Sequence, residues 1–197
     1  MLYNLLVFLL SIVARIVFRI KVHGNNKLPD GKLILCSNHI SLVDPVILAV
    51  VTNRQISFMA KKELFDKPVL GWLISKVGSF PVDRKNADLK AIKESLKVLK
   101  EDRVLGIFPE GTRVKTVSLD NLKPGIGLIA SRSGSDIQPV NIVSTYKLFS
   151  KVDVYFRDII NIDSYDLKSE GVNMRITEDI YKAIYNIEGE LDDNKNS

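Results

Sequence analysis

Apolar and polar positions divide this chain into segments of two kinds. Short, almost wholly apolar runs bounded by turn-forming residues predict buried strands. Longer segments, in which apolar residues recur three and four positions apart, predict amphipathic helices that cover a sheet. The two kinds of segment follow one another along the chain. This order predicts an α/β fold: a single domain with a mostly parallel mixed sheet flanked by helices.

The predicted elements have the following bounds. Strands are expected at residues 20–23, 33–36, 55–60, 78–84, 103–108, 137–143 and 151–156. Helices are expected at residues 46–51, 68–77, 87–100, 126–132 and 177–190, in addition to an N-terminal helix within residues 1–20. The chain shows no internal repeat and no low-complexity linker, and its 197 residues suit one domain.

The most hydrophobic segment of the chain is residues 1–20, of which residues 1–14 carry no charge. A helix that spans a bilayer needs about 20 apolar residues, and Arg15 interrupts a run of that length. Arg15 and Arg19 lie one helical turn apart and place positive charge at one end. We expect a membrane-associating helix that dips into one leaflet, with its basic end among the headgroups. The alternatives are a tilted span and a core helix packed on the domain.

Composition narrows the class of protein. The net charge of +5 suits anionic lipid surfaces, phosphorylated substrates or nucleic acid. Because the lysines are scattered along helix faces without interleaved aromatic residues, we expect no nucleic-acid partner. The single cysteine, Cys36, excludes a disulfide framework and a cysteine zinc cluster, and indicates a reducing compartment. With only His23 and His39 present, no multi-histidine metal site is expected.

The stretch at residues 37–45 joins a predicted strand to a predicted helix, and it places His39 where the strand gives way to a loop. Active sites of α/β sheets lie at the carboxyl ends of their strands. Proline is favoured at the first helical position, so Pro45 predicts Asp44 as the N-cap of the helix. A neutral imidazole can take a proton from a hydroxyl, and a carboxylate can fix its tautomer and stabilise the imidazolium. The pattern therefore indicates a His–Asp dyad, the alternative being a lone loop histidine beside an ordinary N-cap.

Other predicted strands also end at charged residues. Lys61 follows the strand at 55–60, where it can share a side of the sheet with His39 or can belong to a solvated lysine pair. Within residues 78–84, a short strand runs into a loop that ends at Arg84. These positions predict positive charge near the dyad.

The segment at residues 109–113 places an acid, a glycine, a hydroxyl and an arginine beyond another strand end. Gly111 allows backbone N–H groups to approach a ligand closely. Arg113 can bind a phosphate through two parallel hydrogen bonds. The alternative is a plain turn with a Glu–Arg surface pair, which would contribute little to stability.

Taken together and in order, these segments resemble the glycerophospholipid acyltransferase family, and within it the bacterial 1-acylglycerol-3-phosphate acyltransferases. Four blocks within residues 33–140 carry the resemblance: 38–44, with its His-x-x-x-x-Asp pattern, then 78–84, 108–113 and 137–140. One block alone is a weak signal, and the specificity lies in the ordered set.

The resemblance implies roles for particular residues. In that family the histidine deprotonates the acceptor hydroxyl, which attacks an acyl thioester, and the aspartate orients the histidine; here these are His39 and Asp44. Arginines of the second and third blocks bind the glycerol phosphate, which assigns Arg84 and Arg113. The resemblance adds residues that shape the phosphate site and one further phosphate contact: Glu110, Gly111, Thr112 and Lys61.

The expected reaction is acyl transfer from acyl carrier protein or coenzyme A to the sn-2 hydroxyl of lysophosphatidic acid, giving phosphatidic acid for phospholipid biosynthesis. No metal, no cofactor beyond the thioester co-substrate and no covalent enzyme intermediate is implied. Residues 1–20 are expected to form the membrane-associating helix and residues 21–197 the acyltransferase domain, at the cytoplasmic face of the cell membrane. The alternatives are an acyltransferase for another lysophospholipid, and a non-catalytic peripheral membrane protein that binds anionic lipid.

Overall fold

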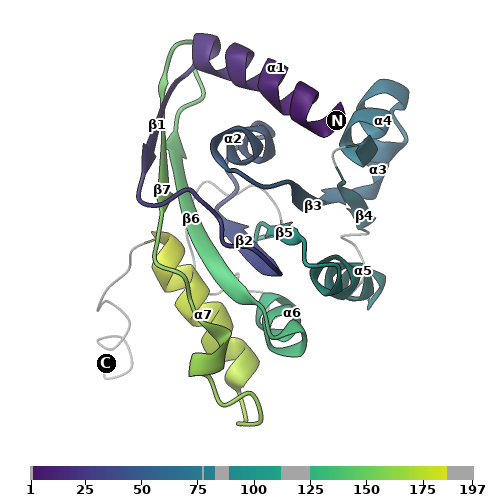
Figure 1. Ribbon diagram of the computed structural model, residues 1–197, viewed down its shortest axis with the longest axis vertical. Helices are drawn as coiled ribbons and strands as arrows, with labels where there is room; N and C mark the ends of the chain where they lie inside the picture. Colours follow the sequence, from purple (N-terminus) through teal and green to yellow (C-terminus); the bar gives the residue numbers. More distant parts are fainter. Residues whose placement is uncertain (1, 77, 83–88, 112–124, 186–197) are drawn as a thin grey trace, which may run out of the picture.

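A seven-stranded sheet forms the centre of the protein (Figure 1). The computed structural model describes residues 2–76, 78–82, 89–111 and 125–185. The strands in chain order are β1 Arg19–His23, β2 Leu33–Ser37, β3 Ile56–Lys61, β4 Phe80–Val82, β5 Val104–Ile107, β6 Asp136–Ser144 and β7 Lys151–Phe156. They lie in the order β1-β7-β6-β2-β5-β3-β4, and every neighbouring pair is parallel except β6 and β7. The predicted mostly parallel mixed sheet is confirmed.

Helices cover both faces of this sheet. Their bounds are α1 Leu2–Val17, α2 Asp44–Val51, α3 Lys62–Phe65, α4 Pro68–Lys76, α5 Leu89–Lys100, α6 Gly125–Ser133 and α7 Val172–Tyr185, with a short 3₁₀ turn at Ile162–Ser164. Helices α1 and α2 lie on one face, and α5, α6 and α7 lie on the other (Figure 1). This arrangement is the three-layer solution for strands that are apolar on both faces.

The central strand β2 shows why two separate cores form. All of its residues are buried, and successive side chains of a strand point to opposite faces. Leu33 and Leu35 accordingly join the core beneath α1 and α2. Ile34 and Cys36 join the core beneath α5, α6 and α7. Cys36 is a buried free thiol in that core. A charged side chain is costly to bury within a strand that is covered on both faces. Charged and polar residues that could act in catalysis are therefore expected in the loop that follows the strand.

Two predicted boundaries differ from the structure. The last helix begins at Val172, directly after Gly171, rather than at residue 177. Gly171 adopts φ of +73°, a conformation that favours glycine, and this ends the preceding turn. The short strand predicted to begin at residue 78 and to run into a loop begins at Phe80 and extends to Val82; residues 83 and 84 lie outside the described residues.

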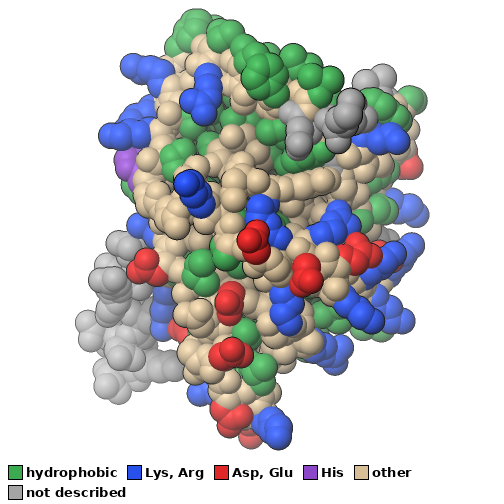
Figure 2. Space-filling view, viewed as in Figure 1, with side chains coloured by type: hydrophobic (Ala, Val, Ile, Leu, Met, Phe, Trp, Pro, Cys, Tyr) green, Lys and Arg blue, Asp and Glu red, His purple; other side chains and the backbone are tan. Residues whose placement is uncertain are grey.

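The N-terminal helix α1 packs against α2 and β1, and buries Ala14 in the core. Large apolar side chains on its other side are exposed: Leu5, Phe8, Leu9, Ile12, Val13 and Ile16. Figure 2 shows them as an apolar upper edge of the molecule. Among the described residues, no helix combines the length and the apolarity that crossing a bilayer requires.

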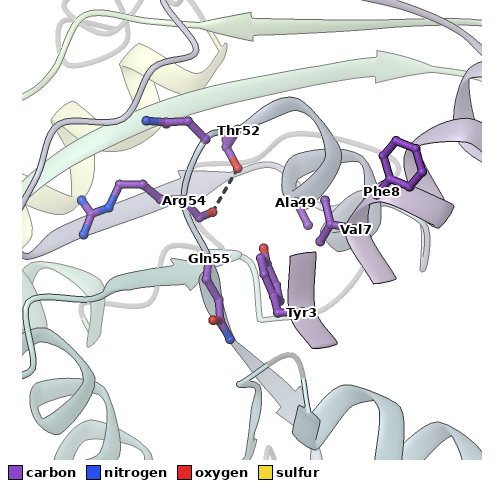
Figure 3. A pocket seen from close by; sticks show the side chains of 8 residues that line it. Tyr3, Val7, Phe8, Ala49, Thr52, Arg54 and Gln55 are labelled. Atoms are coloured by element: carbon purple, nitrogen blue, oxygen red, sulfur yellow. Dashed lines mark hydrogen bonds between the residues drawn. The ribbon is translucent and has the colours of Figure 1, made fainter. Parts of the chain in front are cut away.

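A cavity of about 280 Å³ lies between the start of α1 and the connection from α2 to β3 (Figure 3). Tyr3, Val7 and Phe8 line it from α1. Arg54 supplies a cation, but its guanidinium already donates to the carbonyls of Pro29, Gly31 and Asp102. The guanidinium therefore ties the connection from α2 to β3 to the loop before β2 and to the turn before β5. It is not available to an anion in this cavity.

Candidate active site

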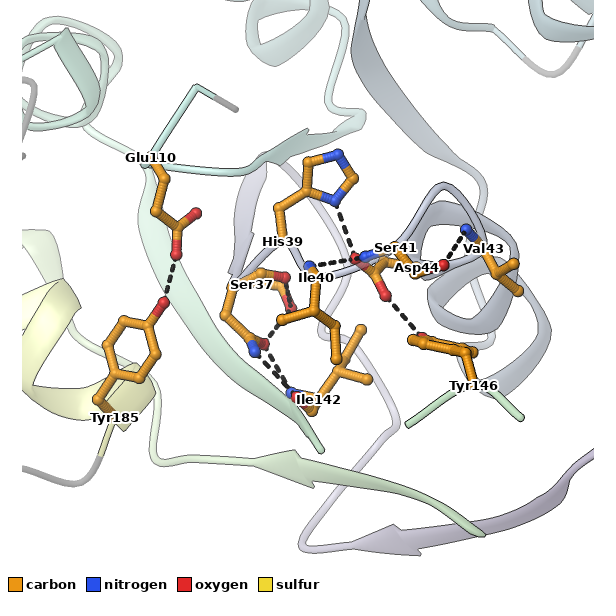
Figure 4. A network of polar contacts seen from close by, with 11 residues as sticks. Ser37, His39, Ile40, Ser41, Val43, Asp44, Glu110, Ile142, Tyr146 and Tyr185 are labelled. Carbon is orange, nitrogen blue, oxygen red and sulfur yellow. Dashed lines mark hydrogen bonds and ion pairs between the residues drawn. The ribbon is translucent and has the colours of Figure 1, made fainter. Parts of the chain in front are cut away.

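The loop between β2 and α2 brings His39 and Asp44 together at the carboxyl end of the central strand. His39 Nδ1 lies 2.8 Å from Asp44 Oδ2. Asp44 is fully buried and His39 is only 6% exposed. A carboxylate only accepts hydrogen bonds, so Nδ1 carries the proton in this pair. The other ring nitrogen, Nε2, lies on the far edge of the ring and points away from Asp44 (Figure 4). That tautomer leaves Nε2 with a lone pair that can accept a proton.

The Asp44 carboxylate is held from several sides. Its Oδ2 also accepts hydrogen bonds from the backbone N–H groups of Ile40 and Ser41, both at 2.7 Å. Its Oδ1 accepts a hydrogen bond of 2.6 Å from the hydroxyl of Tyr146. Donors of this kind stabilise a buried negative charge and fix the plane of the carboxylate.

The prediction that Asp44 is the N-cap of α2 is wrong. Val43 is the N-cap residue and makes no side-chain cap hydrogen bond, while Asp44 is the first helical residue. The carboxylate turns back towards the preceding loop, because the loop N–H groups and the imidazole donate to it there. Asp44 therefore binds His39 and does not cap the helix.

Aromatic rings fix the other side of His39. Phe108, at the end of β5, stacks on the imidazole with ring centroids 4.1 Å apart and planes inclined by 21°. Phe58 from β3 stacks on Phe108 in turn, at 5.7 Å. Because β5 lies between β2 and β3 in the sheet, the three rings form a row across three neighbouring strands. This row limits rotation of the imidazole.

Asn38 anchors the start of the loop. Its side-chain amide donates to the carbonyl of Ile142 at 2.8 Å and accepts from the N–H of Ile142 at 2.7 Å. The side chain thereby continues the pairing of β2 with β6 after β2 itself has ended. Asn38 belongs to the first sequence block, and its contribution is to fix the point from which His39 leaves the sheet.

Glu110 lies beyond the end of β5 and is 4% exposed. The hydroxyl of Tyr185, from α7, donates to its Oε1 (Figure 4). Burial raises the pKa of Glu110, against the opposing effects of that hydrogen bond and of the nearby His39. Among the described residues, its Oε2 has no hydrogen-bond partner. Glu110 is therefore a buried carboxyl group within electrostatic reach of the dyad.

Gly111 closes the turn after β5. Its φ is +65°, in the left-handed region where glycine is favoured, and its N–H donates to the carbonyl of Phe108 at 3.0 Å. The turn holds Phe108 and Glu110 in fixed relation to each other. A residue with a side chain at this position would strain the turn.

The remaining predicted phosphate contacts are not assembled within the described residues. Arg84, Thr112 and Arg113 lie outside them. Lys61 ends β3, at the same edge of the parallel sheet as His39 but two strands away, and pairs with Glu63 at 3.1 Å on the surface. A role for Lys61 in binding phosphate stays a prediction.

Two tyrosines complete this site from the last third of the chain: Tyr146, after β6, and Tyr185, at the end of α7. No local pattern around either residue points to chemistry. Their partners lie 102 and 75 residues away in the sequence. Only the folded chain brings each tyrosine to its carboxyl group.

The profile of the Acyltransferase family matches residues 19–143, which include the whole dyad loop and β5. This chain belongs to the acyltransferase family. The expectation drawn from the four ordered blocks is confirmed at that level.

Curated relatives within the family include two bacterial proteins named 1-acyl-sn-glycerol-3-phosphate acyltransferase. The Streptococcus pneumoniae protein is 38% identical over 160 residues, which is 76% of this chain and 59% of that protein. The Bacillus subtilis protein is 38% identical over 122 residues, covering 61% of this chain and 60% of that protein. The chain thus spans about three fifths of the length of these relatives.

A solved structure shows the same fold for a family member. It is the crystal structure of the 1-acyl-sn-glycerophosphate (LPA) acyltransferase from Thermotoga maritima. The TM-score is 0.72 at 23% identity, with 91% of this chain and 78% of that chain covered. The α/β architecture is therefore shared with that protein at low sequence identity.

Chemically, the site is suited to moving a proton. Nε2 of His39 can take a proton from a hydroxyl, and Asp44 can stabilise the imidazolium that results. The described residues hold no group of three or more His, Cys, Asp or Glu side chains placed to bind a metal ion.

Proposed function

We propose that this acyltransferase moves an acyl group from a thioester to the free sn-2 hydroxyl of 1-acylglycerol-3-phosphate, giving phosphatidic acid. The observation that carries the proposal is the orientation of His39, with Nδ1 held by Asp44 and Nε2 directed away from it. The names of the two bacterial relatives support the choice of acceptor. Acyl carrier protein and coenzyme A are both candidate carriers of the acyl group.

In the proposed reaction, Nε2 of His39 accepts the hydroxyl proton as the substrate oxygen attacks the thioester carbonyl. The oxygen–carbon bond forms, the carbon–sulfur bond then breaks, and the imidazolium returns its proton to the leaving thiolate. Asp44 keeps the proton on Nδ1 and stabilises the transient positive charge. Because the nucleophile belongs to the substrate, the mechanism needs no covalent enzyme intermediate.

The proposed phosphate site lies beside the dyad. Arg84 and Arg113 are its proposed guanidinium contacts, since a guanidinium binds a phosphate through two parallel hydrogen bonds. Gly111, through its turn, and Thr112 are proposed to shape this site, together with Glu110. Lys61, which pairs with Glu63 on the surface, is proposed as a further contact.

The bilayer is the proposed location, with residues 1–20 as the membrane-associating segment and residues 21–197 as the acyltransferase domain. The exposed apolar face of α1 would lie among acyl chains, parallel to the surface (Figure 2). Arg15 and Arg19, near the end of α1, favour the cytoplasmic side, where basic residues flanking membrane segments are enriched. A lysolipid acceptor would then reach the site from the membrane.

A turnover assay that crosses both thioester donors with several lysolipid acceptors tests the proposal. We expect transfer to lysophosphatidic acid and little transfer to acceptors without a terminal phosphate monoester. Equal rates with those acceptors would contradict the phosphate site and favour another lysophospholipid as substrate. Lipid binding with no turnover for any pair would favour the non-catalytic alternative.

The phosphate contact can be tested separately with Arg113→Ala. We expect the KM for the acceptor to rise and turnover to fall, because the cation acts on both bound substrate and transition state. Lys97→Ala is a charge-matched control, since Lys97 lies exposed on α5. Equal kinetics for the two variants would remove Arg113 from the site.

A further inference from the structure

Tyr146 reaches the dyad from the connection between β6 and β7. Its hydroxyl donates to Oδ1 of Asp44 at 2.6 Å (Figure 4). The described residues provide no other hydrogen bond to that oxygen. Burial, together with the charge of Asp44, raises the pKa of Tyr146, so the hydroxyl stays protonated and remains a donor.

The backbone at Tyr146 holds an uncommon conformation. Its φ is +51°, in the left-handed region that a bulky residue seldom adopts. Ser144 Oγ accepts the N–H of Tyr146 at 3.0 Å, and the ring of Phe18 packs edge-on against the tyrosine ring, with centroids 5.5 Å apart. Strain of this kind persists where the surroundings over-determine it, as they do here.

We propose that Tyr146 is a positioning residue for the acyl transfer proposed above. Its hydroxyl fixes the plane of the Asp44 carboxylate and draws negative charge towards Oδ1, away from the oxygen that faces His39. Without that donor, more of the negative charge would lie on the oxygen that faces His39, and the carboxylate would attract the imidazolium more strongly. Glu110 is the other carboxyl group within electrostatic reach of the imidazole, and it is unchanged by the substitution.

Steady-state kinetics of Tyr146→Phe across pH test this role. We expect kcat to fall roughly 10-fold with little change in KM, which is the scale of one hydrogen bond to a buried charge. We also expect the acid limb of the pH–rate profile to move to higher pH. Tyr155→Phe is the matched control, because Tyr155 lies on neighbouring β7 and its ring stacks on His23 instead.

An independent readout comes from the histidine ring signals in NMR, since the chain holds only two histidines. In folded Tyr146→Phe, the ring signals of His39 should shift at a fixed pH while those of His23 stay in place. This measurement needs no turnover, so it stands even if the proposed acyl transfer fails. Unchanged kinetics would overturn the positioning role. A lower kcat with an unmoved acid limb of the pH–rate profile and unshifted His39 ring signals would also overturn it.

A different observation concerns the tip of the same connection. Leu148 and Phe149 are 68% and 59% exposed. Exposed neighbours of this size are unusual on a surface that faces only water. Phe149 N–H donates to the carbonyl of Val17 at 2.8 Å, and Arg19 Nε donates to the carbonyl of Phe149 at 3.1 Å. The tip is thereby fixed to the end of α1, and Figure 1 shows the two side by side.

The residues of this tip and of α1 carry charge of one sign. Residues 1–20 and 144–152 contain no aspartate and no glutamate. Arg15, Arg19 and Lys147 are exposed there. Figure 2 shows basic side chains gathered at this end of the apolar edge. Apolar side chains surrounded by cations match a surface that offers acyl chains beneath anionic headgroups.

We infer that Leu148 and Phe149 form a second bilayer contact, beside α1, on an anionic membrane surface. The inference rests on the proposed membrane location of the enzyme. Two contacts fix the orientation of a protein on a surface, whereas one helix leaves it free to rotate about its axis. Since the tip and Tyr146 belong to one connection, docking would place the dyad at a defined height above the lipid.

Cosedimentation with vesicles of equal parts phosphatidylglycerol and phosphatidylcholine tests this contact. We expect Leu148→Ser/Phe149→Ser to weaken binding by about 10-fold or more, given the apolar area that two such side chains bury. Met174→Ser is the control, because Met174 is 42% exposed on α7.

Phe8→Ser/Ile12→Ser on α1 separates the possible failures. If this variant loses binding and the tip variant binds like the wild type, the second contact is wrong and the membrane location stands. If the wild-type protein itself does not bind the vesicles, both are wrong. Self-association of the wild-type protein that the tip variant abolishes would assign the tip to a second copy of the chain and overturn the inference.

Discussion

The protein contains two histidine–aspartate pairs. The distance from ring nitrogen to carboxylate oxygen is nearly the same in both, but the pairs differ in burial and in surroundings. His39 and Asp44 lie 2.8 Å apart at the end of a central strand. His23 and Asp153 lie 2.7 Å apart on the adjacent strands β1 and β7, at the edge of the sheet. Side-chain exposures are 8% and 0% for the first pair, and 30% and 10% for the second.

The geometry of the two pairs differs as well. His39 uses Nδ1 towards its aspartate, while His23 uses Nε2. Asp44 accepts hydrogen bonds from backbone N–H groups and from a tyrosine hydroxyl, whereas Asp153 forms an ion pair with Lys151 at 2.9 Å. A charge pair near water is screened and can rearrange. The comparison teaches that an imidazole beside a carboxylate becomes a candidate base through its surroundings rather than through the pairing itself.

The largest expected contrast is between His39→Ala and His23→Ala. Loss of a general base slows a reaction by roughly 100- to 10,000-fold, so His39→Ala should reduce turnover to that extent while lipid binding survives. His23→Ala should keep turnover close to wild type. Acyl transfer and vesicle binding measured on both variants check this. Wild-type turnover in His39→Ala would contradict the dyad.

A second contrast exchanges each aspartate for asparagine. Asp44→Asn should lower kcat about 100-fold or more with a smaller effect on KM, because the amide can stabilise the wrong imidazole tautomer and cannot balance the imidazolium. Asp153→Asn should leave both parameters nearly unchanged. Steady-state kinetics on the pair check the difference, and equal losses would mean that both pairs act only through stability.

Tyr185→Phe extends the contrast to the neighbouring carboxyl group. Removing the hydroxyl leaves Glu110 buried with one hydrogen bond fewer, which should cost about 1–3 kcal/mol of stability. The pKa of Glu110, already raised by burial, should rise further because the tyrosine hydrogen bond lowers it. Thermal unfolding and a carboxyl titration by NMR measure these effects. Tyr165→Phe is a control in which a tyrosine hydroxyl is lost from a half-buried pair with Asp179, away from Glu110.

The smallest expected effect concerns the edge pair and pH. Although burial acts to raise it, hydrogen bonds from His23 and Lys151 hold the pKa of Asp153 below its ordinary value. A lowered folded-state pKa contributes stability that is present above the ordinary carboxyl range and is lost as pH falls through the folded value. Asp153→Asn should therefore lower the Tm at neutral pH by about 2 °C or less, with the gap closing in acid. A gap that widens in acid would contradict this sign.

The sequence predicts the strands well because strands buried on both faces are almost wholly apolar. The run at 33–36 and the run at 103–108 both become central strands, β2 and β5. It predicts the His–Asp pair as well, since Pro45 starts the helix and leaves His39 in the preceding loop, whereas on a regular helix side chains five positions apart would point in different directions. The prediction that Asp44 caps α2 was wrong because two partners compete for this carboxylate: the N–H groups at the helix start and the nearby imidazole. The local sequence does not show which of the two it binds.

Local sequence determined the places where chemistry can occur: apolar runs define the strands, and polar residues follow where they end. It also indicated the turn at Gly111, because glycine adopts a positive φ without the steric cost that a side chain brings. Tertiary structure decided how the dyad is held. Sheet order places Phe108 against His39, and long-range packing delivers Tyr146 to Asp44 and Tyr185 to Glu110. Contacts between residues distant in the chain depend on how whole elements pack, and no local pattern of residues encodes that packing.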